Sequence, residues 1–413
     1  MLVKICLIHT PVEELKDDRL DPPMGLLYLG SWLKTKANAD YYDVSIVDLS
    51  GVDAGKWQMF IPVADWYGFS TYTANYHRTL ELKQIALLVN PNAMTIAGGP
   101  HATAMPNEVA KDFDYVVVGD GEVAIERIVN NRPLEKIHKE VPIFDADHLP
   151  YVDYELVGLN SYHRIVNGQK RIPIFSSRGC PYRCSFCTSK TDQYGRYLRQ
   201  RSVPHFVGEI KQILEKYHGI GFRIKDDYFG SNVKWMLEFA RECPPINYDC
   251  LLRANYSPLI PEILKTSGCD MVSMGLESGS GVILQAMHKG NTAKQNRLAV
   301  LGLKDVGIKV LTWIIVGFPG ETWDTVKETV DMLNESAPDI YTVYPLIPYP
   351  GTDVYNNRDK YGLRIIDNDF SHYFYIMGDY EAGYVYETDT LSPSLIKDMK
   401  QYIIENVTES ALR

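Results

Sequence analysis

The sequence has no long hydrophobic run. None of its apolar stretches approaches the roughly 18 residues that are needed to cross a bilayer. The opening stretch, Met1–His9, is apolar over too short a distance for a secretion signal and predicts a buried first strand instead. We therefore expect a cytoplasmic protein that has no membrane partner.

Basic residues are also fewer than acidic residues. The 413 residues include 42 Lys and Arg against 52 Asp and Glu, which gives a formal net charge of -10 at pH 7. Binding to a phosphate backbone needs clustered basic residues, so the composition argues against a nucleic-acid partner. With 45% hydrophobic residues the chain can bury a sizeable core, and its length suggests two or three domains.

A disulfide framework is missing as well, because the seven cysteines are odd in number and three of them are clustered. Cys180, Cys184 and Cys187 have the spacing Cys-x3-Cys-x2-Cys. Thiolates are soft ligands, and three of them can hold three irons of a [4Fe-4S] cluster while the fourth iron stays open to another ligand. Two simpler explanations remain, namely unrelated loop cysteines and a structural zinc site that borrows a distant ligand.

Hydrophobic patterning divides the chain into two α/β series. Residues 1–140 alternate short apolar runs with helical patterns, which predicts a parallel, doubly wound, Rossmann-like domain. Residues 172–350 contain about six further strand–helix units, fewer than the eight of a closed barrel. The fold class is therefore α/β, with a Rossmann-like domain followed by a partial barrel.

Two segments lie outside these series. Residues 141–171 have no clean periodicity and contain Asn167-Gly168, so we expect a linker there. Residues 351–413 form a Tyr-rich C-terminal extension that ends in a helical pattern over 393–411. Its segment 367–386 is a candidate cover for the mouth of the barrel and a candidate substrate contact.

The Cys spacing resembles the signature of the radical S-adenosylmethionine (SAM) superfamily, in which an aromatic residue, here Phe186, precedes the third cysteine. The resemblance covers residues 172–350 and implies a partial barrel of six strand–helix units. It implies that Cys180, Cys184 and Cys187 ligate a catalytic [4Fe-4S] cluster and that SAM chelates the open iron. An electron then cleaves SAM to a 5′-deoxyadenosyl radical, so a donor of flavodoxin or ferredoxin type is expected as a partner.

The same resemblance assigns the SAM site to residues that follow successive strands. These residues are Phe186, Asp226, Asp227, Glu277, Ser278, Trp313 and Gly317. Glu277 is a natural acceptor for ribose hydroxyls, and Gly317 belongs to a segment that passes under the adenine. Taken alone, the pair Asp226 and Asp227 is more simply a helix N-cap.

Glycine-rich turns follow the predicted strands of the first 140 residues. No Gly-x-Gly-x-x-Gly fingerprint follows the first strand, so a dinucleotide site is not indicated. The turns resemble those of the cobalamin-binding domain that precedes the barrel in the cobalamin-dependent radical SAM subclass. That resemblance assigns cobalamin binding to Pro23, Gly25, Leu26, Ser70, Thr71, Tyr72, Gly98, Gly99, Pro100, His101, Gly119, Gly121 and Glu122.

One motif of many cobalamin proteins, Asp-x-His-x-x-Gly, is absent. The resemblance therefore implies that cobalamin binds base-off, without a histidine as the lower cobalt ligand. His101 is expected to be a hydrogen-bonding loop residue.

The subclass resemblance implies a methyltransferase that acts on an unactivated carbon. The radical removes a hydrogen atom, methylcobalamin donates the methyl group, and a second SAM restores the methyl group on cobalt. The expected substrate is a peptide or protein residue, and a small molecule is the alternative. The compact chain is similar to archaeal members that C-methylate methyl-coenzyme M reductase, one of them at a glutamine. Arg253, Tyr349 and Tyr375 are candidate substrate contacts.

Three alternatives stay open. The first is a cobalamin-dependent enzyme that rearranges or oxidises a small molecule without methylating it. The second is a radical SAM enzyme whose N-terminal domain does not bind cobalamin. The third is a non-catalytic module that binds cobalamin or an iron–sulfur cluster.

Overall fold

The computed structural model describes residues 2–12, 19–35, 39–190, 197–374 and 383–408. The chain forms two compact units. Unit 1 consists of Met1–Arg164, Lys190–Gly195 and Asp369–Ile376, and unit 2 consists of Ile165–Ser189, Arg196–Asn368 and Met377–Arg413. The C-terminal extension therefore contributes to both units.

Unit 1 contains a parallel sheet of six strands in the order β2-β1-β3-β4-β5-β6. The strands are β1 Val3–His9, β2 Tyr42–Asp48, β3 Trp66–Ser70, β4 Met94–Gly98, β5 Tyr115–Val117 and β6 Ile137–His138. The strand order reverses between β1 and β3, and such a switch point is where open α/β sheets bind ligands. The predicted Rossmann-like layout is confirmed.

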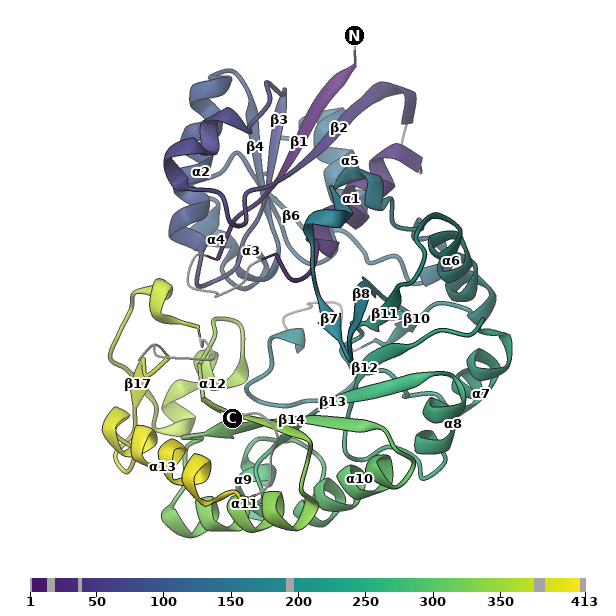
Figure 1. Ribbon diagram of the computed structural model, residues 1–413. Helices are drawn as coiled ribbons and strands as arrows, with labels where there is room; N and C mark the ends of the chain where they lie inside the picture. The colour runs from purple at the N-terminus through teal and green to yellow at the C-terminus, as the bar shows by residue number, and fades with distance from the viewer. Residues whose placement is uncertain (1, 13–18, 36–38, 191–196, 375–382, 409–413) are drawn as a thin grey trace. The chain divides into compact units, whose positions relative to one another are not determined.

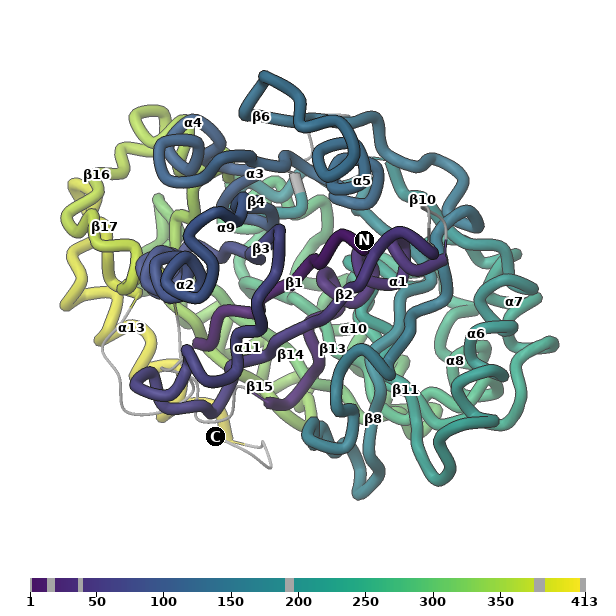
Figure 2. Tube along the Cα trace, turned by 90° about the horizontal axis from the view of Figure 1, so that it is seen from above, coloured from purple at the N-terminus to yellow at the C-terminus, as the bar shows by residue number. Residues whose placement is uncertain are grey.

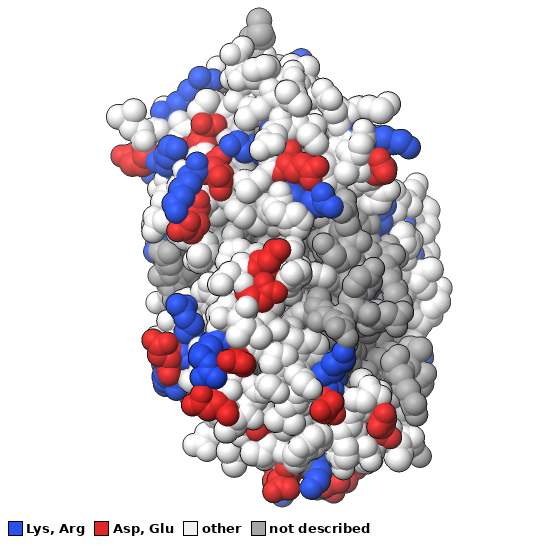
Figure 3. Space-filling model, turned by 90° about the vertical axis from the view of Figure 1, so that its left-hand side faces the viewer, with Lys and Arg blue, Asp and Glu red and all other residues white. Residues whose placement is uncertain are grey.

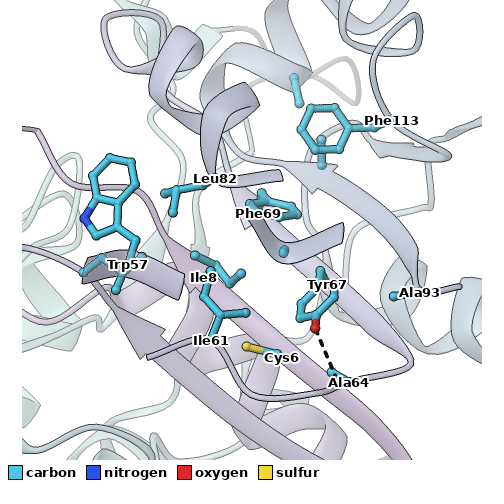
Figure 4. Packing of buried hydrophobic residues seen from close by; sticks show 14 of the residues in the cluster. Cys6, Ile8, Trp57, Ile61, Ala64, Tyr67, Phe69, Leu82, Ala93 and Phe113 are labelled. Atoms are coloured by element: carbon cyan, nitrogen blue, oxygen red, sulfur yellow. Dashed lines mark hydrogen bonds between the residues drawn. The ribbon is translucent and has the colours of Figure 1, made fainter. Parts of the chain in front are cut away.

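Helices cover both faces of this sheet (Figure 1). One face packs against α1 Met24–Thr35 and α5 Glu122–Asn131, and the other against α2 Tyr76–Val89, α3 Pro100–Ala104 and α4 Pro106–Val109. Figure 4 shows the hydrophobic core on the face covered by α2, where Cys6, Ile8, Tyr67 and Phe69 from the strands pack with Leu82 of α2. Because both faces are covered, the strands are apolar on both sides, as a parallel sheet requires.

Short 3-10 turns connect these elements. They are η1 Ala39–Tyr41, η2 Ala54–Met59, η3 Ala146–His148, η4 Tyr154–Leu156 and η5 Leu159–Ser161. The expected linker holds two strands as well, because β7 Ile165–Val166 and β8 Gln169–Ile174 pair antiparallel across Asn167-Gly168. Both turn residues have positive φ, 48° and 77°, so this dipeptide makes a tight hairpin and not a linker crossing.

Unit 2 contains a sheet of seven strands in the order β15-β14-β13-β12-β11-β8-β7. Its other strands are β11 Gly221–Ile224, β12 Tyr248–Leu252, β13 Cys269–Glu277, β14 Lys309–Val316 and β15 Ile340–Pro345. All neighbours from β8 to β15 are parallel, and the two ends of the sheet are not paired to each other. The predicted partial barrel of six strand–helix units is thus confirmed, with β7 as an added edge.

Helices follow the strands of this sheet and lie along its outer side (Figures 1 and 2). They are α6 Val203–Lys216, α7 Val233–Glu242, α8 Ile260–Thr266, α9 Gly281–Ala286, α10 Ala293–Asp305 and α11 Trp323–Ser336. A small antiparallel pair, β9 Ser177–Arg178 with β10 Arg199–Gln200, and the turn η6 Thr188–Lys190 flank the Cys motif.

The two faces of the half-barrel differ in burial. Along β14, Val310, Thr312, Ile314 and Val316 are buried, whereas the residues between them are half-buried or exposed. Parallel partners in register share a face. The more open face, called the inner face below, carries Leu251, Ser273, Leu311, Trp313, Ile315, Thr342 and Tyr344.

The C-terminal extension is built from short elements and one helix. They are α12 Asp353–Asn356, η7 Arg358–Tyr361, β16 Arg364–Ile365, η8 Phe370–His372, β17 Tyr386–Glu387 and α13 Pro393–Asn406. The strands β16 and β17 pair antiparallel, and α13 packs against α11 and β15. The described helix ends at Asn406, five residues before the predicted end.

No helix in the described part of the chain is both long and apolar enough to cross a bilayer. On the face drawn in Figure 3, Lys and Arg side chains stand beside Asp and Glu and do not gather into a basic patch.

Candidate functional site

The Cys motif lies in a loop of unit 2 that follows β9. Gly179 opens the loop with φ +88°, and a Cβ there would lie 2.4 Å from the Tyr197 carbonyl oxygen, so only glycine fits. Ser185 anchors the loop twice, because its N–H donates to the Met287 carbonyl at 2.9 Å and its own carbonyl accepts from the Val354 N–H at 3.1 Å. The loop is therefore tied to the segments that follow β13 and β15.

Arg253, at the end of β12, contacts this loop directly. One of its guanidinium nitrogens lies 3.3 Å from the Cys184 Sγ, and the other donates to the Lys289 carbonyl. The guanidinium stacks over the Tyr182 ring at 3.6 Å. Arg253 therefore connects the end of β12 to the Cys loop and to the segment that contains Lys289.

The donor set fits an iron–sulfur cluster. Burial raises the pKa of the Cys180 and Cys187 thiols, and the charge of Arg253 opposes this at Cys180. Within the described ranges, no three His, Cys, Asp or Glu side chains converge as they would on a single ion. A cubane cluster takes each thiolate on a different iron, so three soft donors on one loop suit it without such convergence.

The two aspartates after β11 have different roles. Asp226 is buried and accepts from the Ser176 N–H at 2.8 Å and from the Ser177 hydroxyl at 2.6 Å. Burial raises the pKa of its carboxyl to about 6, against the lowering effect of these bonds. Asp227 instead accepts from the Gly179 N–H beside the Cys motif. We expect Asp226 to hold the strand ends together and Asp227 to face the cofactors.

A buried ion pair stands at the end of β13. Lys289 Nζ lies 2.7 Å from Glu277 Oε1, and both side chains are nearly inaccessible. Glu277 has φ +67° after a register shift, and a Cβ on Gly275 would lie 2.1 Å from its carboxylate. The bulge and the glycine therefore re-aim Glu277. Lys289 Nζ also sits 5.8 Å from the centre of the Phe186 ring, which brings this pair to the Cys loop.

The remaining predicted SAM residues are distributed over two strand ends. The Ser278 hydroxyl contacts the Thr329 hydroxyl at 3.3 Å and accepts from the Ser280 N–H at 3.0 Å, so it is engaged inside the protein. Trp313 is half-buried on the inner face. Gly317 follows β14 with φ +87° and is buried.

In unit 1 the predicted cobalamin turns meet at the carboxyl ends of β3 and β4. The Thr71 hydroxyl donates to the Gly98 carbonyl at 2.8 Å and accepts from the Ala102 N–H at 3.0 Å. Gly99 has φ +97°, and a Cβ there would lie 3.0 Å from both Thr71 N and Thr71 O. This turn requires glycine for its close approach to Thr71.

His101 is buried in unit 1. Its Nδ1 lies 3.1 Å from the Thr73 hydroxyl, and its ring packs against Tyr76 and Phe370. Burial lowers the pKa of His101 to about 4, so the ring is neutral at pH 7. The predicted role as a hydrogen-bonding residue agrees with this placement.

The other predicted cobalamin residues surround the same edge of the sheet. Leu26 is buried in the core beside α5, and Pro23 and Glu122 are also buried. Gly25 and Gly119 have no atom within 4 Å of a Cβ position, whereas a Cβ on Gly121 would press on Leu29. The residues with accessible surface are Gly25, Tyr72, Pro100 and, in part, Ser70, Gly98, Gly99, Gly119 and Gly121.

These positions fit a large ligand. Open glycine cradles and the aromatic side chain of Tyr72, 43% exposed, line the switch-point edge, where a cofactor can approach the backbone.

Two of the predicted substrate residues can be placed. Arg253 is engaged by the Cys loop, as described above. The Tyr349 carbonyl accepts from the Thr352 hydroxyl at 2.6 Å, and burial raises the pKa of the Tyr349 phenol to about 12. Tyr375 lies outside the described residues.

Comparison with known families separates the same two regions. Residues 174–333 match the radical SAM superfamily, and residues 22–129 match the B12 binding domain. The chain belongs to the cobalamin-dependent radical SAM family, methyltransferase type.

Several known proteins are similar to this chain over most of its length. An uncharacterized methyltransferase of Pyrococcus horikoshii is 29% identical over 85% of this chain and 82% of its own. The anaerobic magnesium-protoporphyrin IX monomethyl ester cyclase of Rubrivivax gelatinosus is 29% identical over 86% of this chain and 69% of its own. The structure of TsrM from Kitasatospora setae, with cobalamin and a [4Fe-4S] cluster bound, has the same fold, with a TM-score of 0.72 and 16% identity over 97% of this chain and 82% of that one.

Sequence reasoning missed several residues of this radical SAM methyltransferase. Lys289 and Tyr386 contact predicted site residues, yet neither belongs to a motif. Tyr182 stands inside the Cys motif, but its contact with Arg253 was not predicted. Glu321 stands four residues after Gly317, but only the structure shows that its side chain accepts a hydrogen bond from the Gly317 N–H. The signal available in the sequence was an acidic residue directly after a turn that contains two glycines and a proline.

Proposed function

We propose that the enzyme methylates an unactivated carbon of a small, largely uncharged organic molecule. When bound, the cluster and SAM supply a radical that removes a hydrogen atom, and cobalamin supplies the methyl group. The residues that would hold the cluster are Cys180, Cys184 and Cys187. Asp227, Glu277, Trp313 and Gly317 would contact SAM, and the open turns around Gly25, Tyr72, Gly99 and Gly119 would contact cobalamin.

The chain's own residues orient these groups. Arg253 donates to the Cys184 sulfur, and the Ser185 backbone holds the loop against the ends of two strands. Lys289 fixes the direction of the Glu277 carboxylate. Contacts of this kind set the distances between reacting groups before the substrate enters, which is the main contribution that a protein makes to cofactor chemistry.

The inner face of the half-barrel carries the proposal about the substrate class. Toward the carboxyl ends of β12 to β15 it presents Leu251, Leu311, Trp313, Ile315, Thr342 and Tyr344, which have no formal charge. Nearer the amino ends, Arg223 lies 3.5 Å from Asp249 and Lys309 donates to Asn167 at 2.9 Å. The charged residues at the carboxyl ends are engaged as well, since Arg253 contacts the Cys loop and Glu277 pairs with Lys289. An apolar wall with a few hydroxyls suits an apolar molecule better than a charged peptide.

A second candidate is ring formation or oxidation without methyl transfer. It is supported by the 29% identity to a cyclase that acts on a magnesium porphyrin ester. That relative also supports a small-molecule substrate for this enzyme. The peptide or protein substrate expected from the sequence stays a prediction.

The test is a product analysis with methyl-deuterated SAM. The anaerobically reconstituted enzyme, loaded with cobalamin and a chemical reductant, is offered apolar ring compounds, among them a porphyrin ester, and a glutamine-containing peptide. We expect a deuterated methyl group on an apolar compound, together with 5′-deoxyadenosine. A deuterated methyl group on the peptide would contradict the proposed small-molecule substrate and indicate a peptide substrate. Turnover of the porphyrin ester without added deuterium would favour the second candidate.

A further inference from the structure

Both backbone polar groups of Gly317 are hydrogen-bonded to side chains. Its N–H donates to the Glu321 carboxylate, and its carbonyl accepts from the Tyr386 hydroxyl. Glu321 is four residues away in the same turn, whereas Tyr386 begins β17 in the C-terminal extension, 69 residues further along the chain. All three residues belong to unit 2 and are buried.

The space beside Gly317 is filled by the same extension. A Cβ there would lie 2.7 Å from the Tyr386 hydroxyl oxygen and 2.9 Å from Ile396 of α13. Because Gly317 has φ +87°, its conformation is one that side-chain-bearing residues rarely adopt. Glycine leaves this turn flexible, so its shape depends on external contacts.

The backbone carbonyls on either side of Gly317 also accept hydrogen bonds. The Val316 carbonyl accepts from the Leu346 N–H at 2.8 Å, and the Phe318 carbonyl accepts from the Glu321 N–H at 2.9 Å. Three separate parts of the chain therefore hold the backbone around Gly317: the segment that follows β15, the turn itself and the extension.

We propose that Tyr386 is a positioning residue for SAM, because its hydroxyl, together with the Glu321 carboxylate, fixes the Gly317 peptide against which SAM binds. This inference rests on the proposed function, in which Gly317 contacts SAM. It gives the C-terminal extension a role in the SAM site, through the hydrogen bond from Tyr386 of β17 to Gly317, which lies inside unit 2. Tyr386 acts through Gly317 and touches no reacting atom.

The experiment measures SAM affinity of the cluster-loaded, cobalamin-loaded enzyme by equilibrium dialysis with labelled SAM. Tyr386→Phe removes the hydroxyl and keeps the ring, and it should raise the Kd for SAM about fivefold, as expected for one neutral hydrogen bond. The melting temperature and the cobalamin content report on folding. The melting temperature should fall only slightly, as for Tyr341→Phe, which also loses one hydrogen bond, and the cobalamin content should equal that of the wild type.

Tyr341→Phe is the matched control. The Tyr341 hydroxyl also joins the sheet to the extension, since it donates to the Ile404 carbonyl at 3.4 Å, but it does not contact Gly317. We expect its Kd for SAM to equal that of the wild type. A second variant, Glu321→Gln, keeps an oxygen acceptor for the Gly317 N–H and should retain SAM binding, whereas Glu321→Ala should weaken it.

The outcomes separate the two proposals. If the wild type binds SAM and Tyr386→Phe binds it within about twofold of the same Kd, the positioning role is wrong and the proposed function stands. If Tyr341→Phe weakens SAM binding as much as Tyr386→Phe, the effect belongs to the whole extension and the specific role is again wrong. If the loaded wild type binds no SAM, the proposed function itself fails.

Discussion

The Cys184 sulfur belongs to the cysteine motif and also makes a tertiary contact with Arg253. The cysteine spacing places three thiols on one loop, and the fold adds Arg253, which lies 3.3 Å from one of them. Cys184 is the most buried of the three, and it lies next to Ser185, the anchor of the loop. These contacts hold the loop against the ends of neighbouring strands, which supports the placement of the three thiols.

Replacing this thiol tests the cluster assignment. Cys184→Ala should abolish formation of 5′-deoxyadenosine, because a cluster that loses one of three thiolates does not hold SAM productively. Binding of cobalamin, which is proposed for unit 1, should persist in the visible spectrum. Cys243→Ala, at the end of α7 and away from the loop, is the matched control and should cleave SAM normally. Persistent cleavage by Cys184→Ala would contradict the assignment.

Among the elements, the turn between β4 and α3 shows how glycine and a neighbouring strand fit together. Gly98 and Gly99 end β4, and Thr71, which follows β3, bonds to both ends of the turn. The sequence showed the glycines and their place after a strand. It could not show that the contact beside Gly99 is the backbone of Thr71, because the two segments are 28 residues apart.

A side chain at this turn should disturb unit 1. Gly99→Ala places a Cβ 3.0 Å from the Thr71 backbone at φ +97°, and we expect the free energy of unfolding to fall by about 1–3 kcal/mol. Retention of cobalamin after desalting should fall with it. Gly25→Ala meets no atom within 4 Å and should leave the stability unchanged in the same urea titration. Equal stability of the two variants would show that the turn relaxes.

For the whole molecule, buried titratable groups give the two units opposite pH dependences. In unit 1, burial lowers the pKa of His101 from 6.5 to about 4, so the folded state favours the neutral ring and stability is lost as the pH falls through this window. In unit 2, burial raises the pKa of Glu321 from 4.5 to about 8. There the folded state binds the proton more tightly, and stability falls as the pH rises from 4.5 to 8.

The Glu321 effect can be isolated by substitution. Unfolding of unit 2 in urea, followed from pH 5 to pH 8, should show a free energy that declines by up to about 1.4 kcal/mol per pH unit from this one group. Glu321→Gln removes the titration, and we expect this part of the slope to vanish. Glu328→Gln, on the exposed side of α11, should keep the slope of the wild type. A slope that is identical in all three proteins would contradict the raised pKa.

The sequence by itself determined the fold class, the order of the two domains and the cofactor family, because strand–helix alternation, cysteine spacing and glycine turns are local patterns along the chain. It also placed Asp226, Asp227, Glu277 and Gly317 after strands, where ligands bind. Only the tertiary structure decided which contacts these residues make. Asp226 accepts hydrogen bonds from two serines, Glu277 pairs with Lys289, and the Gly317 carbonyl accepts from Tyr386. The physical reason is that each of these contacts joins residues distant in sequence, and such pairs form only when the strands are stacked in register.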